Sequence, residues 1–202
     1  VFSQEIQIEN PYQLFQAKEA SGNMENNEAS KISVQFFPEG GDLVDGLVSI
    51  IGVKAMNEEG IGVEVEGGVL NKDGQEISRF KTGTFGLGSF PFKPEAGQKY
   101  RVSIDGQTGK QKHPVPKAKE LGFVFQARLS GENLSITLQS NKPEGLSGSV
   151  MLAHIRGQVF ATLDEFRGPA MRFKLPLSNL PSGIAHFTLF NAEGLPVAER
   201  LV

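Results

Sequence analysis

The chain has 202 residues, a formal net charge of −3 and 39% hydrophobic residues. This apolar content is enough for a packed core and excludes a wholly disordered chain. Acidic and basic residues are interspersed, which excludes the clustered basic surface that nucleic-acid binding requires. Without cysteine, the chain has no disulfide, thiolate nucleophile or cysteine-ligated zinc, and it has no apolar run near the roughly 20 residues of a membrane helix.

The first 30 residues predict a strand remnant followed by an acidic linker. Residues 5–9 alternate polar and apolar side chains, and Pro11 ends this pattern because proline cannot donate to a β-ladder. Residues 12–30 are polar, and a short amphipathic helix over residues 12–20 is the alternative interpretation. The segment is acidic, since Lys18 is its single base against Glu5, Glu9, Glu19, Glu25 and Glu28.

The next part of the chain, residues 31–105, has short apolar–polar alternations separated by turn signals. This pattern is typical of a β-sandwich. Glycine and asparagine predict turns at residues 57–60 and 71–74, and the pair Gly67-Gly68 predicts a β-bulge. The strands that we expect here cover about residues 33–37, 48–56, 63–69, 76–82, 90–92 and 100–104.

Residues 105–119 are polar, contain two glycines and two prolines, and predict a linker. Pro114 and Pro116 make it locally stiff, so we expect a restricted angle between the parts that it joins. The sequence therefore predicts an N-terminal remnant over residues 1–30, one sandwich domain over 31–112 and a second over 113–202. We expect limited proteolysis to cut first within residues 12–30 or within this linker.

The remaining residues predict a second set of strands, which opens with a hairpin. Phe123, Phe125, Ala127 and Leu129 alternate with polar residues, and a turn at 130–133 leads into a returning strand at 134–139. Further strands are expected at about residues 148–156, 158–165, 170–175, 184–190 and 195–202. No window sustains a helical period over three turns. The alternation predicts the following core: Phe123, Phe125, Leu134, Ile136, Leu138, Phe173, Phe187 and Leu189.

The three histidines, His113, His154 and His186, are the first candidates for chemistry. They are scattered, and no His-x-His or Glu-x-x-His spacing supplies the further ligand that a metal site needs. We therefore expect histidines on strand surfaces or with local hydrogen bonds, and no metal site.

Other motifs also favour structural interpretations. Ser182-Gly183 precedes a strand and lacks the nucleophile elbow of a hydrolase. The carboxylate pairs Glu58-Glu59 and Asp164-Glu165 lie at a turn and at a strand end, and glycosidase chemistry needs two carboxylates across a cleft. The glycines at 83, 86 and 88 lack the dinucleotide-binding spacing, and residues 71–74 lack the further ligands of a calcium loop. We expect no catalytic residue and no cofactor; weak calcium binding by turn carboxylates stays open.

Three stretches of the sequence resemble one protein family. They are Val34-Gln35-Phe36-Phe37-Pro38-Glu39-Gly40-Gly41-Asp42-Leu43-Val44, then Gly86-Leu87-Gly88-Ser89-Phe90-Pro91-Phe92-Lys93-Pro94 with Gly97 and Tyr100, and the closing segment from Leu180 to Val202. Together they resemble large envelope proteins of Bacteroidetes that string macroglobulin-like sandwich domains together. Such chains often continue into a carboxypeptidase-regulatory-like domain and a TonB-receptor plug-like segment.

This resemblance, which covers about residues 31–202, implies an all-β chain of two consecutive immunoglobulin-like or macroglobulin-like β-sandwich domains. It also implies export to the periplasm or outer membrane and no catalysis, with neighbouring domains and outer-membrane transport or envelope proteins as partners. The thioester of true macroglobulins needs a cysteine, which is absent here. We expect a structural and interaction module, with a glycan- or peptide-binding module as the alternative. Because the sequence ends within an expected strand, we expect it to be a piece of a longer protein.

Overall fold

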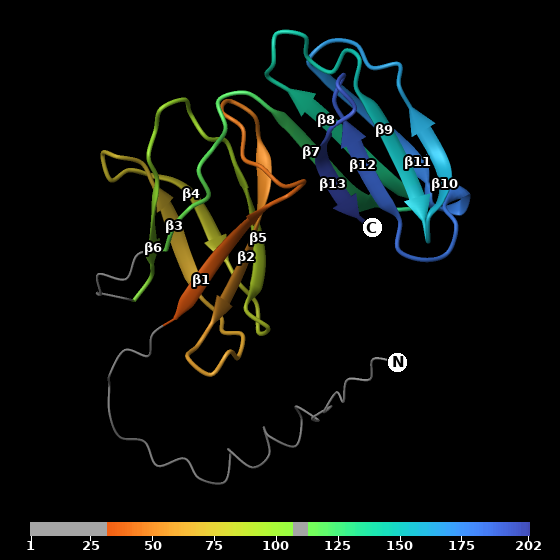
Figure 1. Ribbon diagram of the computed structural model, residues 1–202. Coiled ribbons are helices and arrows are strands. Elements are labelled where there is room, and N and C mark those ends of the chain that lie inside the picture. The colour runs from red at the N-terminus through yellow and green to blue at the C-terminus, as the bar shows by residue number, and fades with distance from the viewer. Residues whose placement is uncertain (1–31, 107–112) are drawn as a thin grey trace, which may run out of the picture. The chain divides into compact units, whose positions relative to one another are not determined.

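The computed structural model describes residues 32–106 and 113–202, and these residues form an all-β structure of antiparallel sheets (Figure 1). The expectations for residues 5–9 and 12–30, and for part of the linker, lie outside the described residues. One short 3-10 helix, η1 (Leu177–Asn179), interrupts the strands. Within the described ranges, no helix has the length and apolarity needed to cross a bilayer.

Six strands form the first part of the structure, which we call the β1–β6 half. They assemble into two three-stranded sheets, with strand orders β1-β2-β5 and β4-β3-β6. All pairings are antiparallel. The strands are β1 (Ser33–Pro38), β2 (Ser49–Met56), β3 (Glu66–Leu70), β4 (Glu76–Lys81), β5 (Leu87–Phe92) and β6 (Arg101–Ile104).

An aromatic core lies between these two sheets. Val34 and Phe36 of β1 and every second residue of β2 are buried, as strands with one core face require. The Phe36 ring lies 5.5 Å from that of Phe80 on the opposite sheet, and Phe80 stacks on Phe90 at 5.5 Å. Phe92 meets Tyr100 edge-on at 5.0 Å. The abundance of phenylalanine in the sequence therefore serves the packing of this core.

The strand expected over residues 63–69 begins only at Glu66, where β3 starts. Residues 62–65 instead cross from one sheet to the other. Val63 N donates to Ala55 O on β2, whereas Thr82 N donates to Val65 O beside the other sheet. The predicted bulge at Gly67-Gly68 is also wrong, since the register shifts two residues later, between Val69 and Leu70. Gly67 is needed for space: a Cβ there would lie 2.5 Å from Ser103 O.

Seven further strands form the second part of the structure, the β7–β13 half. Their sheet orders are β11-β8-β7 and β10-β9-β12-β13. In Figure 1 these strands run from green to blue. They are β7 (Phe123–Ser130), β8 (Asn133–Ser140), β9 (Val150–Ile155), β10 (Gln158–Leu163), β11 (Ala170–Pro176), β12 (His186–Phe190) and β13 (Pro196–Leu201).

The core of this half confirms most of the predicted core residues. Phe125, Phe187 and Leu189 are fully buried between the two sheets. Phe173 differs, because it is only partly buried on β11, the edge strand of its sheet. The remaining predicted core residues, Phe123, Leu134, Ile136 and Leu138, are buried as expected.

Three turns share one Asn-x-x-Gly chemistry. In each, the asparagine Oδ1 accepts hydrogen bonds from the backbone N–H groups two and four residues later. The glycine has a positive φ between 76° and 83°, which side-chain-bearing residues rarely adopt. The turns lie at Asn57 and Gly60 after β2, at Asn71 and Gly74 between β3 and β4, and at Asn191 and Gly194 between β12 and β13.

No sheet in the described residues combines strands from both halves. Each half has its own hydrophobic cluster, and the linker residues Val115 and Ala118 pack against the cluster of the β1–β6 half. Contacts nevertheless group residues 31–202 into one compact unit. The boundaries of two separate domains stay a prediction.

Candidate functional site

A buried glutamate connects the two halves. Glu39 follows directly after β1, and its side chain is only 8% exposed. Its Oε1 accepts a 3.0 Å hydrogen bond from Ala127 N on β7 and lies 3.2 Å from Arg200 Nε on β13. One carboxylate therefore accepts a hydrogen bond from a backbone N–H of the other half and forms an ion pair with a cation of that half.

Gly40 lets the backbone of the β1–β6 half approach β7 closely. Its φ is 85°, and a Cβ at this position would lie 2.6 Å from Phe125 O. On its other side, Gly40 O accepts a hydrogen bond from Glu199 N at 3.3 Å. The Phe-Phe-Pro-Glu-Gly-Gly segment thus contacts the Ala-Glu-Arg-Leu-Val ending of the chain.

A second set of contacts joins the halves through the linker. Lys119 pairs with Val44 in a parallel bridge, and its Nζ lies 2.6 Å from Asp42 Oδ2. The Asn141 side-chain amide donates to Asp45 O at 2.9 Å and to Glu120 O at 2.7 Å. Together with Glu39 and Gly40, these contacts form what we call the junction.

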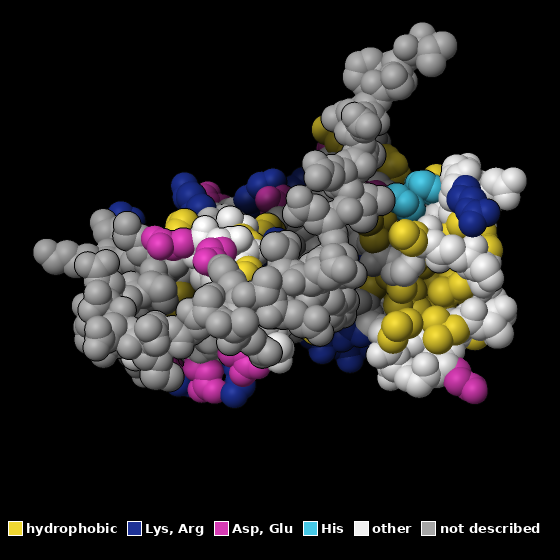
Figure 2. Space-filling view, turned by 90° about the horizontal axis from the view of Figure 1, so that it is seen from below, with side chains coloured by type: hydrophobic (Ala, Val, Ile, Leu, Met, Phe, Trp, Pro, Cys, Tyr) yellow, Lys and Arg dark blue, Asp and Glu magenta, His cyan; other side chains and the backbone are white. Residues whose placement is uncertain are grey.

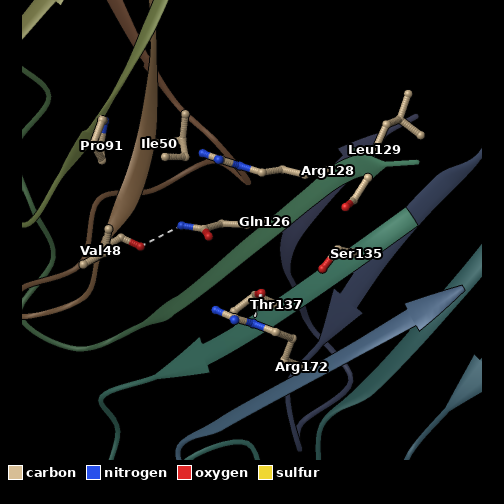
Figure 3. Close-up of a pocket in the computed structure, with 10 residues that line it drawn as sticks. Val48, Ile50, Pro91, Gln126, Arg128, Leu129, Ser135, Thr137 and Arg172 are labelled. Carbon is tan, nitrogen blue, oxygen red and sulfur yellow. Dashed lines mark hydrogen bonds between the residues drawn. The ribbon is translucent and has the colours of Figure 1, made fainter. Parts of the chain in front are cut away.

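A groove with a volume of about 640 Å³ lies beside the junction (Figure 3). One wall is aliphatic and comes from Val48, Ile50 and Pro91 of the β1–β6 half. The Gln126 amide crosses the groove and donates to Val48 O at 2.8 Å. The other wall comes from β7, β8 and β11 and is polar, with Arg128, Ser130, Ser135, Thr137 and Arg172, apart from Leu129.

Strand register explains this polar wall. Arg128 on β7 is paired with Ser135 on β8, which is paired with Lys174 on β11. The next row consists of Gln126, Thr137 and Arg172 in the same order. Because side chains alternate across a strand, both rows share the outer face of this sheet. The residues next to them in the sequence, such as Leu134 and Ile136, face the core.

The cations of this face have no acidic partner among the described residues. The Arg172 Nε donates to Thr137 Oγ1 at 3.2 Å, which leaves its other guanidinium nitrogens available. By contrast, Arg79 and Lys81 on β4 pair with carboxylates, and the Lys81 ammonium lowers the pKa of Glu66 through a hydrogen bond. Glu132 lies in the β7–β8 turn but does not line the groove.

The structure brings His154 and His186 together, which sequence reasoning did not predict. The two are paired across β9 and β12, and their rings stack with centroids 4.8 Å apart. His186 Nδ1 lies 3.4 Å from Glu199 Oε1. Hydrophobic side chains gather beside the histidines (Figure 2). No group of three or more His, Asp or Glu side chains within the described ranges could hold a metal ion.

His113 is buried in the described part of the linker. It is 6% exposed, and its Nε2 has no hydrogen-bond partner among the described residues. This burial lowers the pKa of His113, because a charged imidazole is poorly solvated there.

The other motifs have structural roles. The 71–74 segment is a hairpin turn, as expected, because Asn71 Oδ1 is engaged by backbone N–H groups. The glycine-rich 83–88 segment leads from β4 into the first residues of β5, and a Cβ at Gly86 would clash with Ala55 O. Glu58 and Glu59 lie in an exposed turn, Asp164 and Glu165 follow β10, and Ser182 is exposed before β12.

Sequence reasoning missed the groove because its residues come from distant segments. Arg128 and Arg172 read as ordinary outward-facing strand residues, and only the strand order β11-β8-β7 places them on one face. The available signal was the excess of bases over acids in residues 113–202, nine against seven in a chain of net charge −3.

Comparison of the chain with protein-family models and with curated protein sequences finds no match.

Proposed function

We propose that the chain is a non-catalytic structural and interaction module of a larger exported bacterial envelope protein. In this proposal its two sandwiches hold neighbouring modules at a defined mutual orientation, and its partners are the adjoining domains and other envelope or outer-membrane transport proteins. The export, the envelope context and the link to TonB-dependent transport rest on the resemblance of residues 31–202 to macroglobulin-like envelope proteins of Bacteroidetes.

The observation that carries the proposal is the junction at Glu39. A carboxylate that is 8% exposed, accepts a hydrogen bond from Ala127 N and forms an ion pair with Arg200 favours one docked arrangement. If the halves moved apart, Glu39 and Arg200 would be exposed to solvent and the Ala127 N–H would lose its partner. A spacer with a defined angle benefits from such a contact, whereas a flexible tether does not need it.

The test measures whether the halves keep one orientation in solution. Because the chain has no cysteine, two spin labels can be attached specifically after Lys72→Cys and Glu193→Cys, both at exposed turns. We expect a narrow distance distribution in the parent chain and a broader one after Glu39→Ala. The exposed substitution Glu58→Ala serves as control and leaves the distribution unchanged. A broad distribution in the parent chain would overturn the proposal.

A glycan- or peptide-binding module is the second candidate function. The groove beside the junction favours it, because apolar and polar groups converge there from both halves.

A further inference from the structure

We infer that the groove between β2, β5 and the β7–β8–β11 sheet binds an acidic peptide segment of a partner protein. This inference rests on the peptide-binding form of the second candidate function. It adds a recognition chemistry to the module, and because the groove is lined by both halves, it requires that they stay docked.

Charge is the first argument for an anionic ligand. Arg128 and Arg172 line the groove, Lys174 lies on the same sheet face, and no carboxylate is among the lining residues. None of these three cations forms an ion pair with another described residue. Guanidinium groups free of carboxylates are suited to bidentate pairing with a ligand's carboxylate groups.

Spacing is the second argument, and it favours several separated charges over one small anion. Arg128 and Arg172 lie on strands separated by β8, so their backbones are on the order of 10 Å apart. Figure 3 shows both side chains extending toward the β1–β6 half, with Gln126 between them. An extended peptide with carboxylates on successive side chains of one face, about 7 Å apart, can reach both cations.

The lining of the groove is the third argument, and it favours a peptide over a sugar. The described lining includes no aromatic ring, although ring stacking is a common way to hold the flat faces of ligands. Val48, Ile50, Pro91 and Leu129 instead offer aliphatic surface for the stems of glutamate side chains. Ser130, Ser135 and Thr137 supply hydroxyl groups for the peptide backbone.

The test uses the whole chain and a hexaglutamate peptide with a fluorescent label, followed by anisotropy. We expect binding that weakens with added salt, as for an electrostatic contact. The double substitution Arg128→Gln and Arg172→Gln should weaken it by about tenfold or more, since charge-assisted bonds are lost. The control Lys72→Gln with Lys99→Gln removes the same net charge at exposed sites outside the groove and should leave binding within about twofold.

Competition distinguishes the ligand classes. Hexaglutamine should not displace the labelled peptide, and inorganic phosphate or an oligogalacturonate should displace it only weakly. The inference is overturned if hexaglutamate fails to bind, if the control variant loses as much affinity as the groove variant, or if phosphate or the oligogalacturonate binds as tightly. Narrow spin-label distances without hexaglutamate binding would contradict this inference alone, whereas broad distances would contradict the proposed orientation, so the two failures can be told apart.

Discussion

The contribution of each phenylalanine to the stability of the fold depends on how deeply its ring is buried. Phe187 on β12 is fully buried and meets Phe160 edge-on with centroids 6.0 Å apart. Phe37 on β1 follows the buried Phe36 in sequence but is 52% exposed, because consecutive side chains of a strand face opposite sides. The same residue type therefore has different energetic weight at these two positions.

We expect Phe187→Ala to lower the free energy of unfolding by about 3–5 kcal/mol, since it removes a buried ring and leaves a cavity. Phe37→Ala is the matched control. Because Phe37 is exposed, its loss should lower the free energy of unfolding by less than about 1 kcal/mol. Urea unfolding followed by circular dichroism measures both. Equal costs for the two variants would contradict the assigned register of β12.

The buried His113 predicts a pH dependence of stability. Its folded-state pKa is below the ordinary value of 6.5, so the unfolded chain binds more protons in this range. Its contribution to stability is present above about pH 6.5 and is lost as the pH falls through the lowered folded-state pKa. Because only one proton is involved, His113 can change the free energy of unfolding by at most about 1.4 kcal/mol per pH unit.

We therefore expect His113→Gln to flatten the dependence of unfolding free energy on pH below about pH 6.5. Urea titrations at several pH values, run in parallel on the parent chain and the variant, measure this slope. Parallel curves for the two proteins would show that His113 is not the group responsible.

At the scale of elements, the Asn-x-x-Gly turns fix where strands reverse. Asn191 Oδ1 accepts from Glu193 N and Leu195 N, and Gly194 takes the left-handed backbone between β12 and β13. The side chain thus replaces the backbone acceptors that these N–H groups lack at the chain reversal. The turn is local, so the sequence specifies it without help from the rest of the fold.

We expect Asn191→Ala to destabilise the protein by about 1–2 kcal/mol, because two backbone donors lose their acceptor. Asn191→Asp keeps an oxygen at the same position and should retain most of the stability. Thermal unfolding of both variants beside the parent chain provides the comparison. If aspartate is as disruptive as alanine, the side-chain acceptor is not what stabilises the turn.

Local patterns predicted most strands, because alternation and turn residues act within a few positions. The hairpin of β7 and β8 shows this, with Phe125, Leu134 and Ile136 buried as expected. The errors arose where contacts with residues distant in the sequence determine the local structure. Val63 and Val65 continue a strand-like pattern, but hydrogen bonds to Ala55 and Thr82 direct this segment between two sheets. Gly67 is a glycine because Ser103 O lies close, which no local pattern reveals.

The candidate site was less accessible to sequence reasoning than the fold. Each of its residues is unremarkable in its own strand, and the site exists only through strand order. Arg172 reaches the groove because β11 pairs with β8, and Val48 reaches it because the junction brings β2 near β7. Likewise, His154 and His186 become neighbours only through the pairing of β9 with β12.

At the scale of the whole molecule, the junction links the two halves through a few polar contacts. The stretches around Glu39 and Arg200 carried the family resemblance, and in the structure their residues contact each other. An exposed ion pair near the junction, Asp42 with Lys119, has side chains 39% and 60% exposed. Solvent screens such a pair strongly, whereas the Glu39 carboxylate is largely withdrawn from solvent.

A double-mutant cycle on Glu39 and Arg200 measures this coupling. We expect Glu39→Ala to cost about 1–3 kcal/mol, because the Ala127 N–H loses its hydrogen-bond acceptor and the partly buried guanidinium loses its ion-pair partner. Once Glu39 is removed, Arg200→Ala should cost less than in the parent chain, with an interaction energy of at least about 0.5 kcal/mol. The same cycle on Asp42 and Lys119 is the control, and for that pair we expect about 0–1 kcal/mol. Additive costs at Glu39 and Arg200 in urea unfolding would show that their contact does not couple the halves, and the narrow spin-label distribution would then need another cause.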